Sequence, residues 1–223
     1  SQCTIFCSHG LRSMDAEVIG FSDNRLFLMP YKNVDGLAPG CKVQPRLSNS
    51  LGRLSEAMVG RVLDGFGEPL DGGPVPPYHH YANLNGQIVN PMQRPPINSI
   101  LETGIKAIDT CLTVGRGQRL GLVAGSGVGK SMLLGMMTRN TRADVVVIGL
   151  IGERGREVQE FINNTLGRRG MQKSVVIAAP ANSSPLERIK AAKLTHLVAE
   201  YFRDRGDDVL MLFDSLTRVA HAQ

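Results

Sequence analysis

Apolar positions in the second half of the chain form two kinds of pattern. Short continuous apolar runs occupy 145–151, 175–179 and 209–213. Continuous runs of this length predict strands buried on both faces of a parallel sheet. Between these runs, apolar residues recur at helical spacing over 157–166 and over 184–205, where Ser-Pro-Leu-Glu begins a capping box. The repeated strand and helix units predict an α/β fold, with a mostly parallel sheet and helices on both of its faces.

The first half of the chain has a different pattern. Short apolar runs alternate with turn residues from about 16 to 47, and Asp23-Asn24 has the composition of a hairpin turn. We expect a small N-terminal β-barrel there. Residues 1–15 carry little pattern and are interpreted as an incomplete piece of that barrel. Prolines and glycines then dominate an ordered, irregular connection. The predicted organisation is an incomplete β-barrel domain over 1–50, a connection over 51–98 and an α/β core over 99–223.

One stretch of the core carries a specific chemical signal. The apolar run 120–123 is predicted to be a strand, and it leads through a glycine-rich turn into Lys130, Ser131 and a helical pattern. This order is typical of the phosphate-binding loop of nucleoside triphosphatases, although Ala124 stands where the strict motif has glycine. Glycines let backbone N–H groups approach phosphate oxygens, and a helix N-terminus favours an anion. The residues expected to bind nucleotide are Gly125, Ser126, Gly127, Val128, Gly129, Lys130, Ser131 and Met132.

Two acidic residues directly follow predicted strands, at the carboxyl ends of the strands, where ligands bind in sheets of this kind. Asp214 has the position of a carboxylate that holds Mg²⁺ together with the Ser131 hydroxyl, and its alternative role is a helix N-cap. Glu153 has the position of a carboxylate that orients and polarises the attacking water. Arg154 beside it could stabilise phosphate charge. The alternative for the whole GERGRE segment is a cluster of surface ion pairs.

Composition excludes several other classes of protein. The chain has 42% apolar residues and a net charge of +5, which indicates a globular protein with a modest basic surplus. Neither a transmembrane-length apolar run nor a signal-peptide pattern is present. The four cysteines lack metal-ligand spacing and are expected to be free thiols, and the pair His79-His80 is expected to be solvated. The chain begins without Met and stops within a helical pattern, so we expect a piece of a longer protein.

The motifs in combination resemble those of one family. LETGIKAID, GQRLGLVAGSGVGKS, LIGERGREV and LMLFDSLTR, in this order, are similar to the catalytic subunits of rotary-type hexameric ATPases, which include the F1 catalytic subunits. GRVLDGFGEPLDG matches the same family at the junction between barrel and core. Within the family, LTVGRGQR, AGSGVGKS and NPMQRPPI most resemble the flagellum-specific ATPase of bacterial type III protein export, and the injectisome ATPase is a close second.

The resemblance implies hydrolysis of ATP with Mg²⁺ by a homohexameric ring in the cytoplasm, peripheral to the inner membrane at the flagellar base. The implied partners are a stalk or regulator subunit, export-gate proteins, and export chaperones with their substrates. The family's arginine finger, adenine pocket and C-terminal domain would lie beyond Gln223, so this piece alone is expected to be weakly active. The resemblance also assigns roles: phosphate and Mg²⁺ binding to Lys130 and Ser131, activation of water to Glu153, Mg²⁺ association to Asp214, and proximity to the γ-phosphate to Arg154 and Arg218.

Three other functions remain as alternatives. A subunit of an ATP synthase or vacuolar-type enzyme shares the GER motif, but the flagellar-type segments argue against it. A hexameric RNA translocase has a related core, but it carries an acidic residue where this chain has Gly152, and the aromatic residues of the barrel here are not interleaved with basic ones. We therefore expect no nucleic-acid partner. A structural ring subunit without turnover would be expected to lose Lys130 or Glu153, and both are present.

Overall fold

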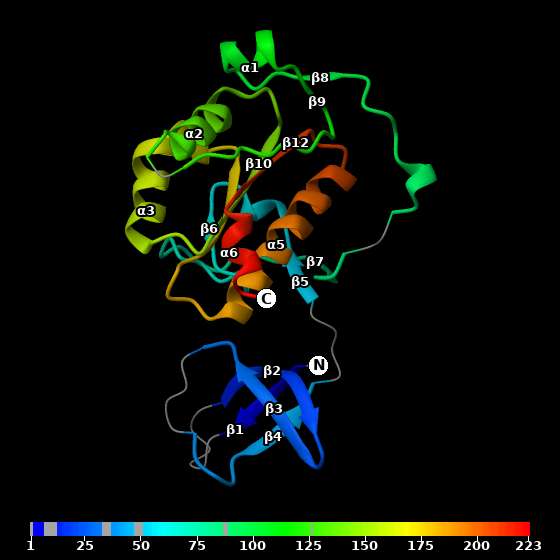
Figure 1. The fold of residues 1–223 in the computed structure, drawn as a ribbon, viewed down its shortest axis with the longest axis vertical. Coiled ribbons are helices and arrows are strands. Elements are labelled where there is room, and N and C mark those ends of the chain that lie inside the picture. The colour runs from blue at the N-terminus through cyan, green and yellow to red at the C-terminus, as the bar shows by residue number, and fades with distance from the viewer. Residues whose placement is uncertain (1, 7–12, 33–36, 47–50, 87–88, 126) are drawn as a thin grey trace.

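A computed structural model describes residues 2–6, 13–32, 37–46, 51–86, 89–125 and 127–223. Its N-terminal part is a small antiparallel sheet in the order β3-β2-β1-β4 (Figure 1). The predicted hairpin at Asp23-Asn24 is confirmed, because β2 and β3 pair antiparallel on either side of it. The strands are β1 (Gln2–Phe6), β2 (Ser13–Ser22), β3 (Arg25–Pro30) and β4 (Lys42–Pro45).

The core is built on a parallel sheet in the order β12-β10-β11-β6. Every residue of β10 and of β11 is buried, as expected for strands that are covered on both faces. The prediction of a parallel α/β core is therefore confirmed. The four strands are β6 (Val62–Leu63), β10 (Val145–Ile151), β11 (Ser174–Ala179) and β12 (Val209–Asp214).

Helices cover both faces of this sheet, as predicted. In Figure 1, α2 (Lys130–Asn140) and α3 (Gly155–Glu160) lie on one side of β10, and α5 (Pro185–Asp204) lies on the other. Alternate residues of the strands divide between two cores, so Val146 and Ile148 pack with α2 and α3 while Val145 and Val147 pack with α5. Burial of these two apolar faces is the main favourable contribution to folding. The shorter helices are α1 (Lys106–Cys111), α4 (Gly167–Met171) and α6 (Leu216–Ala220).

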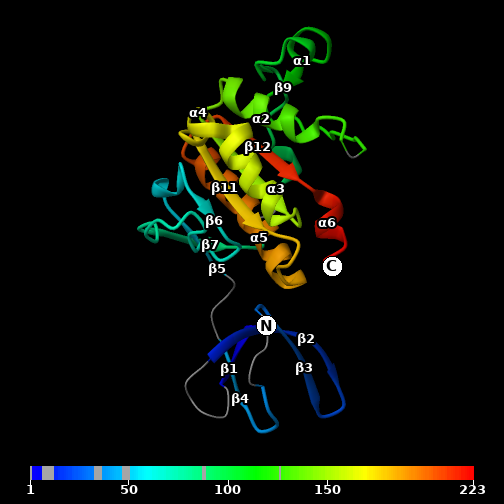
Figure 2. The same cartoon turned by 90° about the vertical axis from the view of Figure 1, so that its left-hand side faces the viewer.

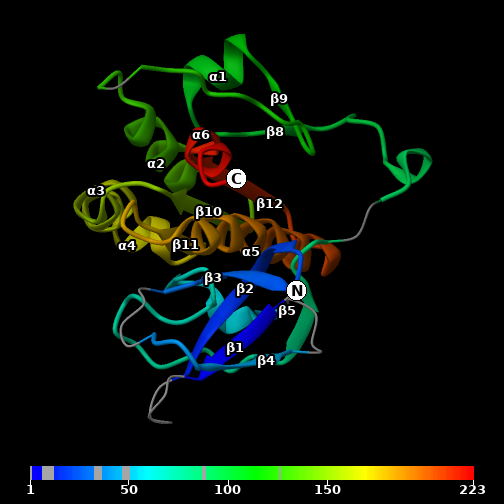
Figure 3. The ribbon, with the colours of Figure 1, turned by 60° about the horizontal axis from the view of Figure 1, so that its bottom comes forward.

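The predicted capping box at the start of α5 is confirmed. The Ser184 hydroxyl accepts a hydrogen bond of 3.2 Å from the backbone N–H of Glu187, and Pro185 is the first helical residue. The same hydroxyl donates to the carbonyl oxygen of Tyr31 at 2.7 Å. The ammonium group of Lys190, about two turns further along, lies 5.2 Å from the centre of the Tyr31 ring. These contacts join the N-terminal part of the chain to the start of α5. Figures 2 and 3 show the ribbon of the N-terminal sheet on that side of the core.

The prediction of a strand over 120–123 is wrong. No strand is present there, and the side chains are exposed, with Val123 at 97%. A strand needs a neighbour to accept its hydrogen bonds, and this run lies beside no described strand, whereas β12 forms the edge of the core sheet. The helical pattern of 100–112 forms a helix only over α1, because β8 (Ile100–Leu101) precedes it and pairs with β9 (Val114–Gly115).

Three further segments differ from the sequence expectations. The weakly patterned N-terminal residues form β1 and the start of β2, because Cys3, Ile5 and Ala16 bury a small core between them. The irregular connection contains β7 (His80–Asn83), which pairs with β5 (Leu51–Leu54), and His80 stacks on Tyr201. Short 3₁₀ turns occupy Glu56–Met58 and Pro91–Gln93. The domain boundaries proposed from the sequence remain predictions.

Cys3 and Cys111 are free thiols, as expected, whereas Cys7 lies outside the described residues. Within the described ranges, no helix combines the length and the apolar character needed to cross a bilayer.

Asp71 fixes the turn that follows β6. Its carboxylate accepts hydrogen bonds of 2.7 Å from both Nε and Nη2 of Arg61, and it also accepts from the backbone N–H groups of Val62 and Gly73. The Arg61 guanidinium and these backbone donors hold the pKa of the Asp71 carboxyl well below its usual range. A carboxyl with a lowered pKa in the folded state stabilises the fold above its unfolded pKa, and the stabilisation is lost as the pH falls.

We expect Asp71→Asn to reduce the free energy of unfolding at pH 7 by about 1.5–3 kcal/mol, the range for hydrogen bonds to charged groups. The difference between wild type and variant should narrow as the pH falls below about 5, because protonation removes the same charge from the wild type. Urea unfolding followed by circular dichroism at several pH values measures both effects. Equal stability of the two proteins at pH 7 would contradict the assigned role of Asp71.

Candidate functional site

The glycine-rich loop leads directly into α2. Gly127 and Gly129 have φ values of 78° and 95°, a left-handed conformation that side-chain-bearing residues rarely adopt. The loop is open to solvent, with Val128 at 66% exposed, while Ser126 lies outside the described residues. The first N–H groups of α2 have no partners within the helix, so the N-terminus of α2 offers hydrogen-bond donors to an anion. The local geometry therefore fits phosphate binding.

Lys130, the first residue of α2, reaches across to the end of β12. Its Nζ lies 2.5 Å from Oδ1 of Asp214, which is the last residue of β12 and is buried. Asp214 does not cap the following helix, because the N-cap of α6 is Ser215 and lacks a side-chain cap. Ser131 follows in the first turn of α2 and is exposed, as is Met132. A hydroxyl and a carboxylate are oxygen ligands of the kind that Mg²⁺ prefers, so these residues fit the predicted ion.

Glu153 follows the neighbouring strand β10, so it lies at the same end of the parallel sheet as Asp214. Its carbonyl oxygen accepts a hydrogen bond of 2.9 Å from the N–H of Ala181, which fixes the turn after the strand. Burial raises the pKa of the Glu153 carboxyl, and the nearby carboxyls of Glu157 and Asp214 raise it further, whereas Lys130 opposes them. Glu153 therefore shares one electrostatic environment with Lys130 and Asp214 at the carboxyl ends of β10 and β12.

The two arginines assigned by resemblance lie differently. Arg154 is exposed, and its Nη1 lies 3.6 Å from Oε1 of Glu157. This contact is part of the ion-pair cluster that the sequence offered as an alternative for GERGRE. Arg218 in α6 packs against Gly152, where an added Cβ would lie 2.6 Å from the Cβ of Arg218. Gly152 also has a φ of 77°, so an acidic residue there, as in the RNA-translocase alternative, would be both strained and crowded.

The comparisons with known proteins agree with this geometry. Residues 104–223 match the nucleotide-binding domain of the ATP synthase alpha/beta family. The chain belongs to this family. The matched range contains every residue that the sequence assigned to the site, and the N-terminal sheet lies before it.

Relatives within the family confirm the predicted resemblance. The chain is 51% identical to the flagellum-specific ATP synthase of Pseudomonas aeruginosa, with 100% of this chain and 50% of the relative covered. It is 55% identical to the protein of that name in Salmonella typhimurium, with 95% of this chain and 48% of the relative covered. The chain thus spans about half the length of these curated relatives.

A solved structure from a type III secretion system has the same fold as this chain. The assembled ATPase EscN of the enteropathogenic Escherichia coli type III secretion system matches with a TM-score of 0.89 and 38% identity. The match covers 99% of this chain and 53% of EscN. The identity to flagellar proteins is higher than the identity to this injectisome protein, so the injectisome alternative is not the better supported one.

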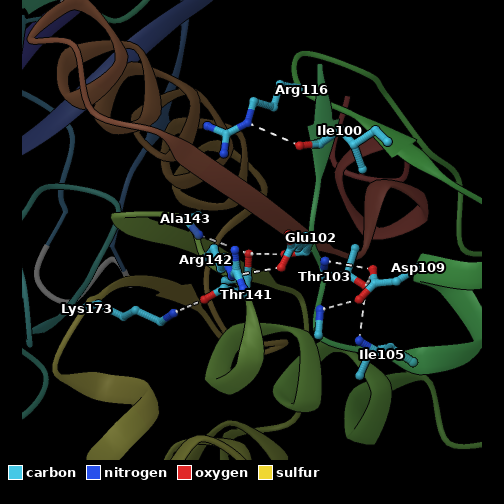
Figure 4. Close-up of polar contacts among 11 residues, drawn as sticks. Ile100, Glu102, Thr103, Ile105, Asp109, Arg116, Thr141, Arg142, Ala143 and Lys173 are labelled. Carbon is cyan, nitrogen blue, oxygen red and sulfur yellow. Dashed lines mark hydrogen bonds and ion pairs between the residues drawn. The ribbon is translucent and has the colours of Figure 1, made fainter. Parts of the chain in front are cut away.

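The far end of α2 is fixed by a polar network that the sequence analysis did not identify (Figure 4). Asp109 of α1 accepts hydrogen bonds from the N–H of Thr103 at 2.9 Å, from its hydroxyl at 2.7 Å and from the N–H of Gly104 at 2.9 Å. The Thr103 hydroxyl lowers the pKa of the Asp109 carboxyl. Gly104 in turn lies against the last residue of α2, since an added Cβ would come within 2.7 Å of the carbonyl oxygen of Asn140.

Thr141, the residue that ends α2, belongs to the same network. Its hydroxyl donates to the carbonyl oxygen of Glu102 at 3.1 Å, and its own carbonyl oxygen accepts from Nζ of Lys173 at 2.6 Å. A cation at a helix C-terminus is favourable because it satisfies a free carbonyl group and complements the helix dipole. The helix that presents the phosphate-binding loop is therefore anchored at its opposite end. In the sequence, the only hint of this network is the segment ETGIKAID, in which Thr103 and Asp109 lie six residues apart at the start of a helical pattern.

Proposed function

We propose that the full-length protein hydrolyses ATP with Mg²⁺ and that hydrolysis energises flagellar protein export. The observation that carries this proposal is the convergence of Lys130, Asp214 and Glu153 beside the open glycine loop at the start of α2. A loop for phosphate, a lysine, a buried acid and a second acid with a raised pKa are the groups that phosphoryl transfer to water needs. The identity to flagellum-specific ATP synthases supports the physiological part of the proposal.

In this proposal each residue has one task. The backbone N–H groups of the loop and Lys130 bind the β- and γ-phosphates, and Lys130 leaves Asp214 to do so. Ser131 and Asp214 would hold Mg²⁺, which would supply positive charge beside the phosphate oxygens. Glu153 accepts a hydrogen bond from the attacking water and orients it in line with the γ-phosphorus. Arg154 and Arg218 are assigned to phosphate charge that develops during transfer.

We further propose a homohexamer that works in the cytoplasm at the inner-membrane face of the flagellar base. EscN is described as an assembled ATPase, and a second structure holds it in complex with its central stalk EscO. By similarity, we assign a stalk or regulator subunit, export-gate proteins, export chaperones and export substrates as partners here. The injectisome remains the second candidate system, followed by an ATP synthase-type role.

Assembly gives the proposed function a direct test. We expect the specific activity of the full-length protein to rise with protein concentration, because each active site would be completed by a neighbouring subunit. Phosphate release measured beside analytical ultracentrifugation tests this expectation. Constant specific activity in a strictly monomeric sample would contradict the assembly proposal. Stimulation by polycytidine with a steep salt dependence would instead favour the RNA-translocase alternative.

A further inference from the structure

Gly135 lies where α2 packs directly against the helical segment that follows Glu153. It is a buried residue of α2. A Cβ added to Gly135 would overlap Cγ2 of Thr165, and it would lie 3.2 Å from the carbonyl oxygen of Thr165 and 3.3 Å from its Cβ. The space between the two segments therefore excludes even one methyl group in their present positions.

Thr165 lies in a continuous helical stretch that begins at Gly155, two residues after Glu153. It belongs to a π-helical segment, Phe161–Leu166, which continues α3 without a break because Phe161 keeps a right-handed helical conformation. The sequence predicted one regular helix here, since helical periodicity does not distinguish the wider π turn. α3 starts immediately after Glu153 and Arg154. A displacement at Thr165 is thus passed along one helical body toward Glu153.

The surroundings of this contact leave little freedom for adjustment. Leu134, Val158, Phe161 and Leu166 are buried in the same core on both sides of it. Close-packed cores transmit displacement because they have few voids to absorb it. The other end of α2 is anchored by Thr141 and its network, so α2 is not free to move away. A side chain at position 135 should therefore shift α3 and the π segment.

We propose that Gly135 is a positioning residue that sets the distance between the helix carrying Lys130 and the helix following Glu153. The inference rests on the proposed hydrolysis at this site, and it extends the site to a residue that does not touch the nucleotide. Misplacement of a catalytic group by about 1 Å can cost about 10²-fold in rate. Phosphate binding depends on the loop and Lys130, which precede Gly135 on the anchored helix. The contact therefore governs turnover and leaves nucleotide affinity unchanged.

Three variants of the full-length protein test this inference: Gly135→Ala, Thr165→Ala and the double variant. Gly135→Ala should lower kcat about tenfold to 10²-fold without a change in the Kd for Mg²⁺-ATP. Alanine is the better helix former, so a loss cannot come from helix propensity. Thr165→Ala should be close to wild type. The double variant should recover most of the lost kcat, because it lacks the Cγ2 atom that the new methyl group would overlap.

Each other outcome overturns the inference. Normal kcat in Gly135→Ala, equal losses of kcat and affinity, or no recovery in the double variant would each contradict it. A single variant that fails to fold beside a normal double variant would make Gly135 a requirement for folding and not for positioning. An inactive wild type would instead refute the proposed function, and this inference with it. Thermal unfolding of all four proteins separates these cases.

Discussion

Lys130→Ala is expected to abolish ATP hydrolysis by the full-length protein while leaving the fold intact. Lys130 directly follows the phosphate-binding loop as the first residue of α2, and its ammonium group contacts Asp214. Loss of one group that stabilises charge in a transition state costs about 10²–10³-fold in rate, and this lysine would also contribute to binding of the β- and γ-phosphates. Nucleotide affinity should therefore fall together with turnover.

Lys106→Ala is the matched control for this experiment. Lys106 is also the first residue of a helix, α1, and it is exposed. Phosphate release and nucleotide affinity of this variant should equal those of the wild type. Circular dichroism of both variants checks the fold. Wild-type phosphate release by Lys130→Ala would contradict the assignment of the phosphate-binding loop.

Glu153→Gln is expected to separate chemistry from binding. The substitution keeps the size of the side chain and some of its hydrogen bonding, but it removes the carboxylate that would orient and activate water. Turnover should fall by about 10²–10⁴-fold, the usual contribution of a positioned general base. Nucleotide affinity should persist, because Lys130 and the loop amides are unchanged. Asp214→Asn should differ, since it should weaken Mg²⁺-dependent binding as well as the rate.

The exposed Glu160 in α3 offers a control with the same change of charge. Glu160→Gln should leave both turnover and affinity unchanged. Affinity for ATP is measured with and without Mg²⁺ for the three variants, alongside phosphate release. If Glu153→Gln turns over normally, or loses affinity as severely as Lys130→Ala, Glu153 is a structural residue of the surface ion-pair cluster.

The parts of the fold that were predictable from the sequence are those with local or continuous signals. β10 and β11 are covered on both faces, so their apolar runs are unbroken and their bounds follow from the sequence. The start of α5 was predictable because a capping box acts over a single turn. The order of strands and motifs in the sequence also predicted that the loop, Glu153 and Asp214 lie together at the carboxyl ends of the strands.

The parts that were not predictable depend on partners far away in the sequence. Whether the run 120–123 forms a strand depends on a neighbouring strand, and apolar character alone does not supply one. The pairing of β1 with β2 and β4 is likewise non-local. The contact between Gly135 and Thr165 joins two helices whose separate patterns look ordinary. A carboxylate such as Asp109 shows its structural role only when its donors are in place.

The ion pair between Lys130 and Asp214 joins two residues that are proposed to have separate roles in binding Mg²⁺-ATP. Nζ of Lys130 lies 2.5 Å from the Asp214 carboxylate, so the lysine forms an ion pair with the acid that is proposed to associate with Mg²⁺. In the proposed complex with Mg²⁺-ATP, we expect Lys130 to move from Asp214 to the γ-phosphate, because Asp214 would then associate with the metal ion. New charge-assisted contacts to phosphate would offset the loss of this ion pair.

The most direct measurement is a structure of the full-length protein with Mg²⁺ and a non-hydrolysable ATP analogue. We expect the β- and γ-phosphates to lie on the N–H groups between Gly127 and Ser131, with Lys130 moved from Asp214 to the γ-phosphate. We also expect Glu153 to lie within reach of the water in line with that phosphate. A nucleotide bound elsewhere, or a Lys130–Asp214 ion pair that persists with the analogue in the loop, would contradict the proposed site.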